Sequence, residues 1–238
     1  MITATPDTQR FNRSDSEFLT ILTTEHYNLQ SARSATISDS NGRAGLFLSS
    51  VSSSLVALAF IGQAAQFGTA FRVFGLVLFP VLLALGLFTF ERVLQSAVED
   101  IVYAYGITRI RHYYAEMAPD AAPYFVLSTH DDGPGMMRDM GARGGFGQLF
   151  LTTAGMIGVL DSALAGVFAA LLTDTLVTHA LAVGTALGLA VFAVSLVSHF
   201  WYQRDAFLRM NRNHAPLFPS PPESAPREAD TLAGESQY

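Results

Sequence analysis

The sequence contains neither cysteine nor lysine, and charged side chains are scarce in it. Without cysteine, the chain can form no disulfide, no thiolate nucleophile and no zinc–thiolate centre. Only 14% of the 238 residues are charged, whereas a soluble domain carries about a quarter. The net charge of −6 argues against nucleic acid as a partner, because phosphate binding requires a basic surface. Several classes of enzyme and binding protein are therefore excluded before any motif is considered.

Motifs of catalysis are also missing. The sequence has no Ser-His-Asp arrangement, no HExxH motif and no paired catalytic carboxylates. The stretch HDDGPG at residues 130–135 offers His130, Asp131 and Asp132 as metal ligands, but no fourth ligand follows at a recognisable spacing. An Asp-initiated turn is the preferred interpretation of this stretch. We therefore expect no catalytic residue, no metal site and no cofactor.

Four apolar windows make up much of the chain. They lie at residues 44–67, 73–90, 149–172 and 177–201, and Asp161 is the only Asp, Glu, Lys or Arg residue in them. Each window is long enough to cross a hydrocarbon core of ~30 Å as a helix rising ~1.5 Å per residue. The polar remainder of the chain is too short to bury four such helices. The sequence therefore predicts an all-α protein with four transmembrane helices, arranged as two hairpins in a lipid bilayer.

The arginines predict the orientation of these spans. Thirteen of the 14 arginines lie before the first window, between the second and third, or after the fourth, and Arg72 alone lies on the other side. By the positive-inside rule both termini are expected in the cytoplasm of a bacterial cell, with the spans in its inner membrane. No apolar run precedes residue 44, so no cleavable signal peptide is expected.

These patterns divide the chain into six expected regions. They are a flexible N-terminus (1–14), a cytosolic helix (15–43), a transmembrane hairpin (44–90), a cytosolic helix and loop (91–148), a second transmembrane hairpin (149–201) and a largely disordered cytosolic tail (202–238). Within the second region, a helix is expected over residues 15–38 and a break at Asn41-Gly42. Residues 215–238 are rich in Pro, Ser and Glu, a composition typical of disorder.

The second span is expected to continue as a helix beyond the membrane. Leu94, Val98, Ile101 and Tyr105 recur at helical spacing after residue 90, and no glycine or proline intervenes before Gly106. An apolar stripe outside the bilayer requires a covering surface. The N-terminal helix, running antiparallel to it, is the expected cover. Together the two would form a cytosolic helical extension.

Asp161 is the main candidate for a functional residue. It lies near the middle of the third window, where an ionised carboxylate facing lipid would be costly, so we expect it to face the bundle. No arginine or lysine lies inside a span to pair with it. Matching residues by depth suggests hydroxyl partners, namely Ser52, Ser53, Ser54 and Thr185. The carboxyl would then either join helices by hydrogen bonds or serve as a proton or ion site.

Small residues are expected to pack the helices. Gly158, Ser162 and Gly166 in the third window, and Gly184 and Gly188 in the fourth, recur at four-residue spacing. Such ridges let two helices approach closely, which predicts either a tight hairpin or a contact between protomers. At the cytoplasmic end of the fourth span, His199, Trp201 and Tyr202 fit an aromatic belt at the membrane surface.

The first half of the chain also suggests a family. A polar helix, Arg43, two spans and the long helix FERVLQSAVEDIVYAYGITRIRHYY resemble small bacterial multi-span proteins of unknown function. In organisation, residues 15–118 are similar to SLATT-type and four-span effectors of conflict systems, which are thought to perturb membranes. This resemblance implies a non-enzymatic, homo-oligomeric membrane effector or signalling protein with no assigned site residues. A small proton- or ion-coupled transporter using Asp161 and a structural accessory subunit of a membrane complex, with an unknown protein partner, are the alternatives.

Overall fold

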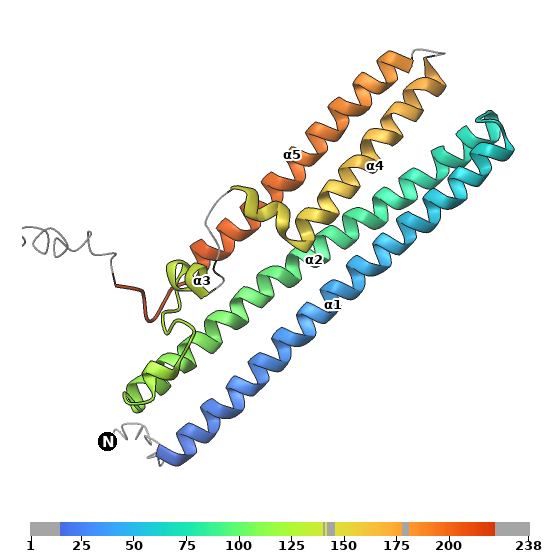
Figure 1. Ribbon diagram of the computed structural model, residues 1–238. Helices are drawn as coiled ribbons and strands as arrows, with labels where there is room; N and C mark the ends of the chain where they lie inside the picture. Colours follow the sequence, from blue (N-terminus) through green and yellow to red (C-terminus); the bar gives the residue numbers. More distant parts are fainter. Residues whose placement is uncertain (1–14, 140, 142–145, 178–180, 222–238) are drawn as a thin grey trace, which may run out of the picture.

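The computed structural model describes residues 15–139, 141, 146–177 and 181–221 as a set of helices (Figure 1). The expected flexible N-terminus, residues 1–14, lies outside them. No strand occurs among the described residues, so the all-α prediction is confirmed. In chain order the elements are α1 (Asp15–Ala64), α2 (Thr69–Met117), η1 (Ala122–Tyr124), α3 (Gly133–Asp139), η2 (Phe146–Leu151), α4 (Thr153–Leu176) and α5 (Leu181–Asn213). Four of them, α1, α2, α4 and α5, are long and apolar enough to cross a membrane.

The helix α1 runs without interruption for 50 residues, so the predicted break at Asn41-Gly42 is wrong. A glycine inside a helix costs only about 1 kcal/mol. Contacts on both sides of the position offset that cost: Arg33 pairs with Asp100 of α2 at 2.7 Å, and Phe47 is fully buried. Because α1 packs along α2 before and after Gly42, tertiary contacts outweigh the local preference for a turn.

Two hairpins lie side by side (Figure 1), and α2 and α4 form the contact between them. The residues of α2 and α4 pair in opposite directions. Arg72 of α2 lies 3.8 Å from Asp174 of α4, and Gly86 of α2 lies against Asp161. We call residues 44–64, 73–90, 153–176 and 182–201 the apolar bundle. Its turn end contains the α1–α2 turn, and its other end, here the polar end, continues into the extended helices.

The second hairpin packs closely through its small residues. A Cβ atom on Gly166 would lie 2.7 Å from the carbonyl oxygen of Gly188, and the reverse distance is the same. Gly184 lies against the backbone of Ala170, and Gly158 against the side chain of His199. The predicted ridges therefore meet within one chain. Because α4 extends to Leu176 rather than ending near residue 172, the register with α5 differs from the one the windows suggested.

Outside the apolar bundle, α1, α2 and α5 continue and form a polar extension (residues 15–43, 91–139 and 202–221). The second span does continue as a helix, to Met117, as predicted. The cover for its stripe is different from the expected one. Tyr105 stacks on His214 with ring centroids 3.8 Å apart and bonds to Asn211, and Leu94 lines a groove against α5. The end of α5 therefore covers this stripe.

The N-terminal helix contacts another face of α2. Leu29 lies against Gly106, and Phe18 packs edge-on against Tyr113 with ring centroids 5.1 Å apart. These contacts, with the Arg33–Asp100 pair, confirm that α1 runs antiparallel to α2 in the same chain. The sequence correctly predicts that the N-terminal helix packs along α2, but not which face of α2 it contacts. The polar composition after residue 201 did not indicate that α5 continues there and contacts the stripe.

The start of the expected disordered tail is also ordered by specific contacts. Asp131, which is fully buried, accepts hydrogen bonds from the backbone of Leu217 and Phe218 and from the side chain of Arg109. Asp132 accepts two more from Ser220. Residues 215–221 therefore do not fit the prediction of disorder, because two adjacent carboxylates hold them against the loop. Residues 222–238 lie outside the described part.

These contacts also set the charge state of Asp131. Burial alone would raise the pKa of its carboxyl, but the hydrogen bonds from Arg109 and the two backbone amides outweigh burial and lower the pKa. Asp132 accepts the backbone N–H of Gly135 at 2.8 Å and so begins the turn into α3. The turn interpretation of HDDGPG is thus the one the structure shows.

Candidate functional site: a buried aspartate–histidine pair

Asp161 lies deep between helices, with only 1% of its surface exposed. It is the ninth residue of α4, because that helix begins at Thr153 and not at the start of the apolar window. The carboxyl therefore lies between the middle of α4 and the polar end of the apolar bundle. Its side chain points at Gly86 of α2, where the ring of Phe47 from α1 also packs.

The nearest polar partner of Asp161 is His199 of α5. The Nε2 atom of His199 lies 3.4 Å from Asp161 Oδ2. The other ring nitrogen, Nδ1, lies 2.9 Å from the carbonyl oxygen of Ser195, one turn earlier in α5. A carbonyl oxygen can only accept, so Nδ1 must carry a hydrogen and donate it. The neutral ring then turns the lone pair of Nε2 toward the carboxyl.

This geometry fixes how many protons the pair needs. Without a proton between them, the lone pair of Nε2 would face a buried carboxylate, leaving an uncompensated negative charge. With one proton, either a neutral carboxyl donates to Nε2, or an imidazolium faces a carboxylate. Both arrangements have a net charge of zero, which a buried site favours. The geometry is therefore compatible with a single proton held between two helices.

Both groups also have unused hydrogen-bonding capacity. Neither Asp161 Oδ1 nor His199 Nε2 makes a hydrogen bond of good geometry, although both are buried. An unsatisfied buried polar atom is rare in a folded protein and requires an explanation. Oδ1 lies directly over Gly86, and a Cβ atom on that residue would overlap it. Glycine is therefore the only residue that lets α2 approach the carboxyl this closely.

The predicted hydroxyl partners of Asp161 do not contact it, so that prediction is wrong. Ser52 and Ser53 are exposed on the outer face of α1, Ser54 is half-exposed, and Thr185 is exposed near the turn end. The mistake came from the register of the second hairpin. Because α4 and α5 turn later than expected, Asp161 meets α5 near His199 rather than near Thr185.

His199 and Gly86 are the two site residues that the sequence did not reveal. His199 was assigned to an aromatic belt, and its ring instead points inward, packed edge-on against Phe90 with centroids 4.7 Å apart. The sequence did contain a signal, because His199 is a titratable side chain near the polar end of the fourth apolar window. Gly86 carried no signal, because one glycine in an apolar window is common in membrane helices.

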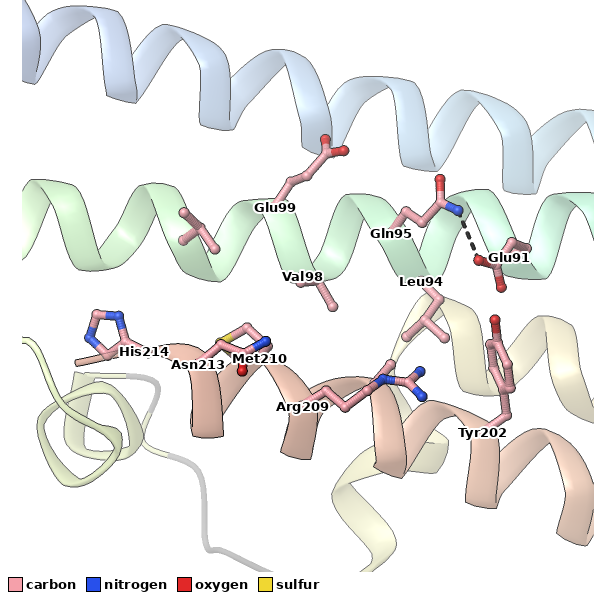
Figure 2. Close-up of a pocket in the computed structure, with 12 residues that line it drawn as sticks. Glu91, Leu94, Gln95, Val98, Glu99, Tyr202, Arg209, Met210, Asn213 and His214 are labelled. Atoms are coloured by element: carbon pink, nitrogen blue, oxygen red, sulfur yellow. Dashed lines mark hydrogen bonds between the residues drawn. The ribbon is translucent and has the colours of Figure 1, made fainter. Parts of the chain in front are cut away.

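The ring of His199 borders a cavity at the polar end of the bundle. The cavity has a volume of about 270 Å³ and is lined by Leu87, Phe90, Glu91, Ser198, His199 and Tyr202. Glu91 and Tyr202 also line a larger groove of about 650 Å³ between α2 and α5, and Figure 2 shows the tyrosine pointing from α5 toward the glutamate. Leu94 and Val98 line the same groove farther along α2. His199 thus lies between this open space and the buried Asp161.

A metal centre finds little support in this arrangement. Among the described residues, no three His, Asp or Glu side chains lie close enough together to hold a metal ion. Asp161 and His199 offer two ligand atoms. The side chains around them are those of Phe47 and Phe90, with the hydroxyls of Ser162 and Ser195 each 3.4 Å from His199 Nδ1. The chemistry available to the pair is the binding and transfer of a proton.

Comparison with known proteins adds no family assignment. The chain matches no protein-family model, no curated protein and no solved structure. The function must therefore be argued from the geometry of this chain alone.

Proposed function

We propose that this chain is a non-enzymatic, proton-responsive membrane protein whose apolar bundle spans the bilayer. In this proposal the polar extension and both termini lie in the cytoplasm. Support comes from the distribution of the arginines, since Arg72 is the only one at the turn end and is paired there with Asp174. The length and apolar character of four helices support the spanning arrangement.

The observation that carries the proposal is the buried contact between Asp161 and His199. An ionisable group inside a membrane is costly and is kept mainly for function. Here two such groups from different helices share one proton, and a third helix contributes a glycine at the same point. Removing the proton would leave a charge among α2, α4 and α5, so the proton state is coupled to how these helices pack.

The test uses Trp201, the only tryptophan of the chain, which lies two residues after His199 and is partly exposed. Its emission is recorded against pH for the full chain in lipid nanodiscs. The wild type should show a transition that Asp161→Asn and His199→Gln both remove. The matched control is Asp174→Asn, which removes the other carboxylate of the apolar part of α4 and should keep the transition. Identical curves for all four proteins would refute the proposal.

Signalling or membrane perturbation is the use of the proton that we favour. The helices α1 and α2 pass without a break from the apolar bundle into the polar extension, so movement at the pair would reach that extension. Self-association would fit the outer face of α1, where Gly45, Ser52 and Ser53 are exposed among apolar residues. Small side chains on an outward face allow another helix to approach closely. A homo-oligomer formed through α1 is therefore part of this proposal.

The second candidate function is proton-coupled transport. The same pair favours it, because a carrier also needs a carboxyl that gains and loses a proton within the membrane. Proton flux into vesicles separates the two. A carrier would show flux that Asp161→Asn abolishes, whereas a signalling protein would show no more flux than empty vesicles. The role of a structural accessory subunit has no particular observation in its favour.

A further inference from the structure

We infer that protons reach and leave the Asp161–His199 pair from the polar end alone, through the cavity that holds Glu91 and Tyr202. This inference rests on the proposed function, which supplies the binding of the proton. It goes further by naming the route, the residue that would pass the proton on, and the side of the membrane from which the pair is read.

The polar end of the route is lined by groups that can carry a proton. His199 lines the cavity with 11% of its side chain exposed, and Glu91 and Tyr202 line the same cavity. Tyr202 lies one helical turn beyond His199 on α5 and points toward Glu91 in Figure 2. These two are the titratable groups that face the pair from α2 and α5. From α1 the facing side chain is Phe47, which does not titrate.

The turn end of the route is closed by apolar side chains. Residues 76–85, 163–172 and 186–194, which face one another beyond the pair, include no polar side chain. Ten helical residues span about 15 Å, and a file of water over that distance would need polar partners along it. Leu82 and Leu164 are buried in this layer, and the backbones of Gly166 and Gly188 touch. Among the serines of α1 at this depth, Ser52 and Ser53 face outward and Ser54 is half-exposed.

The transfer itself needs no other reactant. In the inferred route a proton leaves the carboxyl of Glu91 and is passed to Nε2 of His199, so that one O–H bond breaks and one N–H bond forms. Because Nε2 is buried against Asp161, the imidazole ring turns toward the cavity to receive the proton and then turns back. The imidazolium then faces the Asp161 carboxylate, or passes the proton to Oδ2 and becomes neutral again. Release follows the same steps in reverse, and water in the groove returns Glu91 to its starting state. Uptake and release therefore occur on one side of the membrane, as a sensor requires.

Proteoliposomes that hold the full chain test this route. The pair is reported by the infrared band of a protonated carboxyl or of an imidazolium that disappears in both Asp161→Asn and His199→Gln. The change of this band is followed in time after a pH step. Vesicles are sorted by whether protease reaches the polar extension from outside. The band should respond when the step is applied to the polar end, and should stay unchanged over the same time when the step is applied to the turn end.

Glu91→Gln should slow this response by about tenfold or more, since a carboxyl that relays protons is lost while its size is kept. The matched control is Glu99→Gln, which lies two turns farther along α2 and lines the larger groove but not the cavity at His199. It should respond as fast as the wild type. A purely structural role for Glu91 would change the size of the band rather than its rate.

Each outcome has a distinct meaning. A response to a step at the turn end, or an unchanged rate in Glu91→Gln, overturns the inferred route and leaves proton binding intact. If neither a carboxyl band nor an imidazolium band of the wild type depends on Asp161 and His199 at any pH, the proposed function itself fails. A slow response in Glu91→Gln together with a silent turn end supports the route.

Discussion

Two aspartates of this chain are buried to nearly the same degree, yet they are treated in opposite ways. Asp131, in the polar extension, is satisfied by an arginine and two backbone amides. Asp161, in the apolar bundle, has one histidine at 3.4 Å and an oxygen without a hydrogen bond. A carboxylate whose bonds are complete holds structure in place at any ordinary pH. One whose bonds are incomplete depends on a proton, and this difference marks Asp161 as the candidate for function.

The largest effect should come from removing the satisfied carboxylate. Asp131→Ala leaves Arg109 without its partner and two backbone amides without acceptors, so a loss of about 3 kcal/mol is expected. Denaturant unfolding in detergent measures it. The control is Asp205→Ala, which removes an exposed carboxylate paired with Arg209 and should cost less than about 1 kcal/mol. Equal losses in the two variants would show that Asp131 holds nothing together.

Acid should reproduce part of that loss. The pKa of Asp131 is lowered in the folded chain, because its hydrogen bonds outweigh its burial. A lowered pKa stabilises the folded state above the ordinary range of an Asp carboxyl, and this stability disappears as the pH falls through the folded pKa. Hydrogen exchange of the amides of Leu217 and Phe218 should stay slow until the pH falls to the lowered pKa of Asp131, and it should speed up below that pKa. In Asp131→Asn their exchange should show no such acid transition.

The close approach at Gly86 should be the next most sensitive point. In Gly86→Ala the new methyl group would overlap Asp161 Oδ1, so a loss of about 1–3 kcal/mol is expected from overpacking. Thermal unfolding in detergent measures it against Gly45→Ala, where nothing lies within 4 Å of the added carbon. The double variant Gly86→Ala/Asp161→Ala should regain part of the loss, because the carboxyl no longer occupies the space. Without that recovery, the two residues are not in contact.

Neutral substitution of Asp161 should cost less. In Asp161→Asn the amide can donate a hydrogen bond to His199 Nε2, so stability should stay within about 1 kcal/mol of the wild type. Asp161→Leu removes this partner and should lose more. The same unfolding measurement compares the three proteins. If Asp161→Asn were as damaging as Asp131→Ala, the two aspartates would be structural in the same way and the contrast between them would disappear.

The smallest effect on stability is expected at the hydroxyls that depth matching suggests as partners of Asp161. Ser52→Ala and Thr185→Val alter exposed side chains far from the pair, so each should change the stability of a single chain by less than about 0.5 kcal/mol. Unfolding at low protein-to-detergent ratio measures this. A larger loss in either variant would mean that its hydroxyl reaches the site after all.

The sequence was sufficient for the helices and insufficient for their register. Apolar length and the absence of charge identify four candidate spans, because the cost of exposing polar groups in lipid is large and general. The partner of Asp161 depends on where the α4–α5 turn falls. The helix α4 continues four residues past its expected end, and His199 rather than Thr185 lies beside the carboxyl. Turn positions follow from small local preferences, so the end of α4 could not be predicted to within one helical turn.

Contacts between segments distant in the sequence could not be predicted from the sequence either. The buried role of Asp131 depends on backbone amides of Leu217 and Phe218, which lie more than 80 residues later. Their composition suggested disorder, and only the carboxylates across from them make them ordered. The break expected at Gly42 failed for the same reason, since α2 supplies contacts on both sides of it. Local sequence patterns predict which segments are helical, whereas contacts with distant segments determine where a helix or an ordered segment ends.

The helices α1 and α2 run without a break from the apolar bundle into the polar extension, and each has more residues in the extension than in the bundle. Residues 91–117 of α2 extend about 40 Å beyond the apolar bundle. Met117 lies about 46 Å along α2 from Gly86, so a pivot of about 5° at Gly86 would move this end of the helix by roughly 4 Å. Displacements of one or two ångströms between packed helices are enough to switch protein states. A change as small as one proton at Asp161 could thus be magnified mechanically at the distal tip, near Tyr113 and Met117, where a partner could detect it.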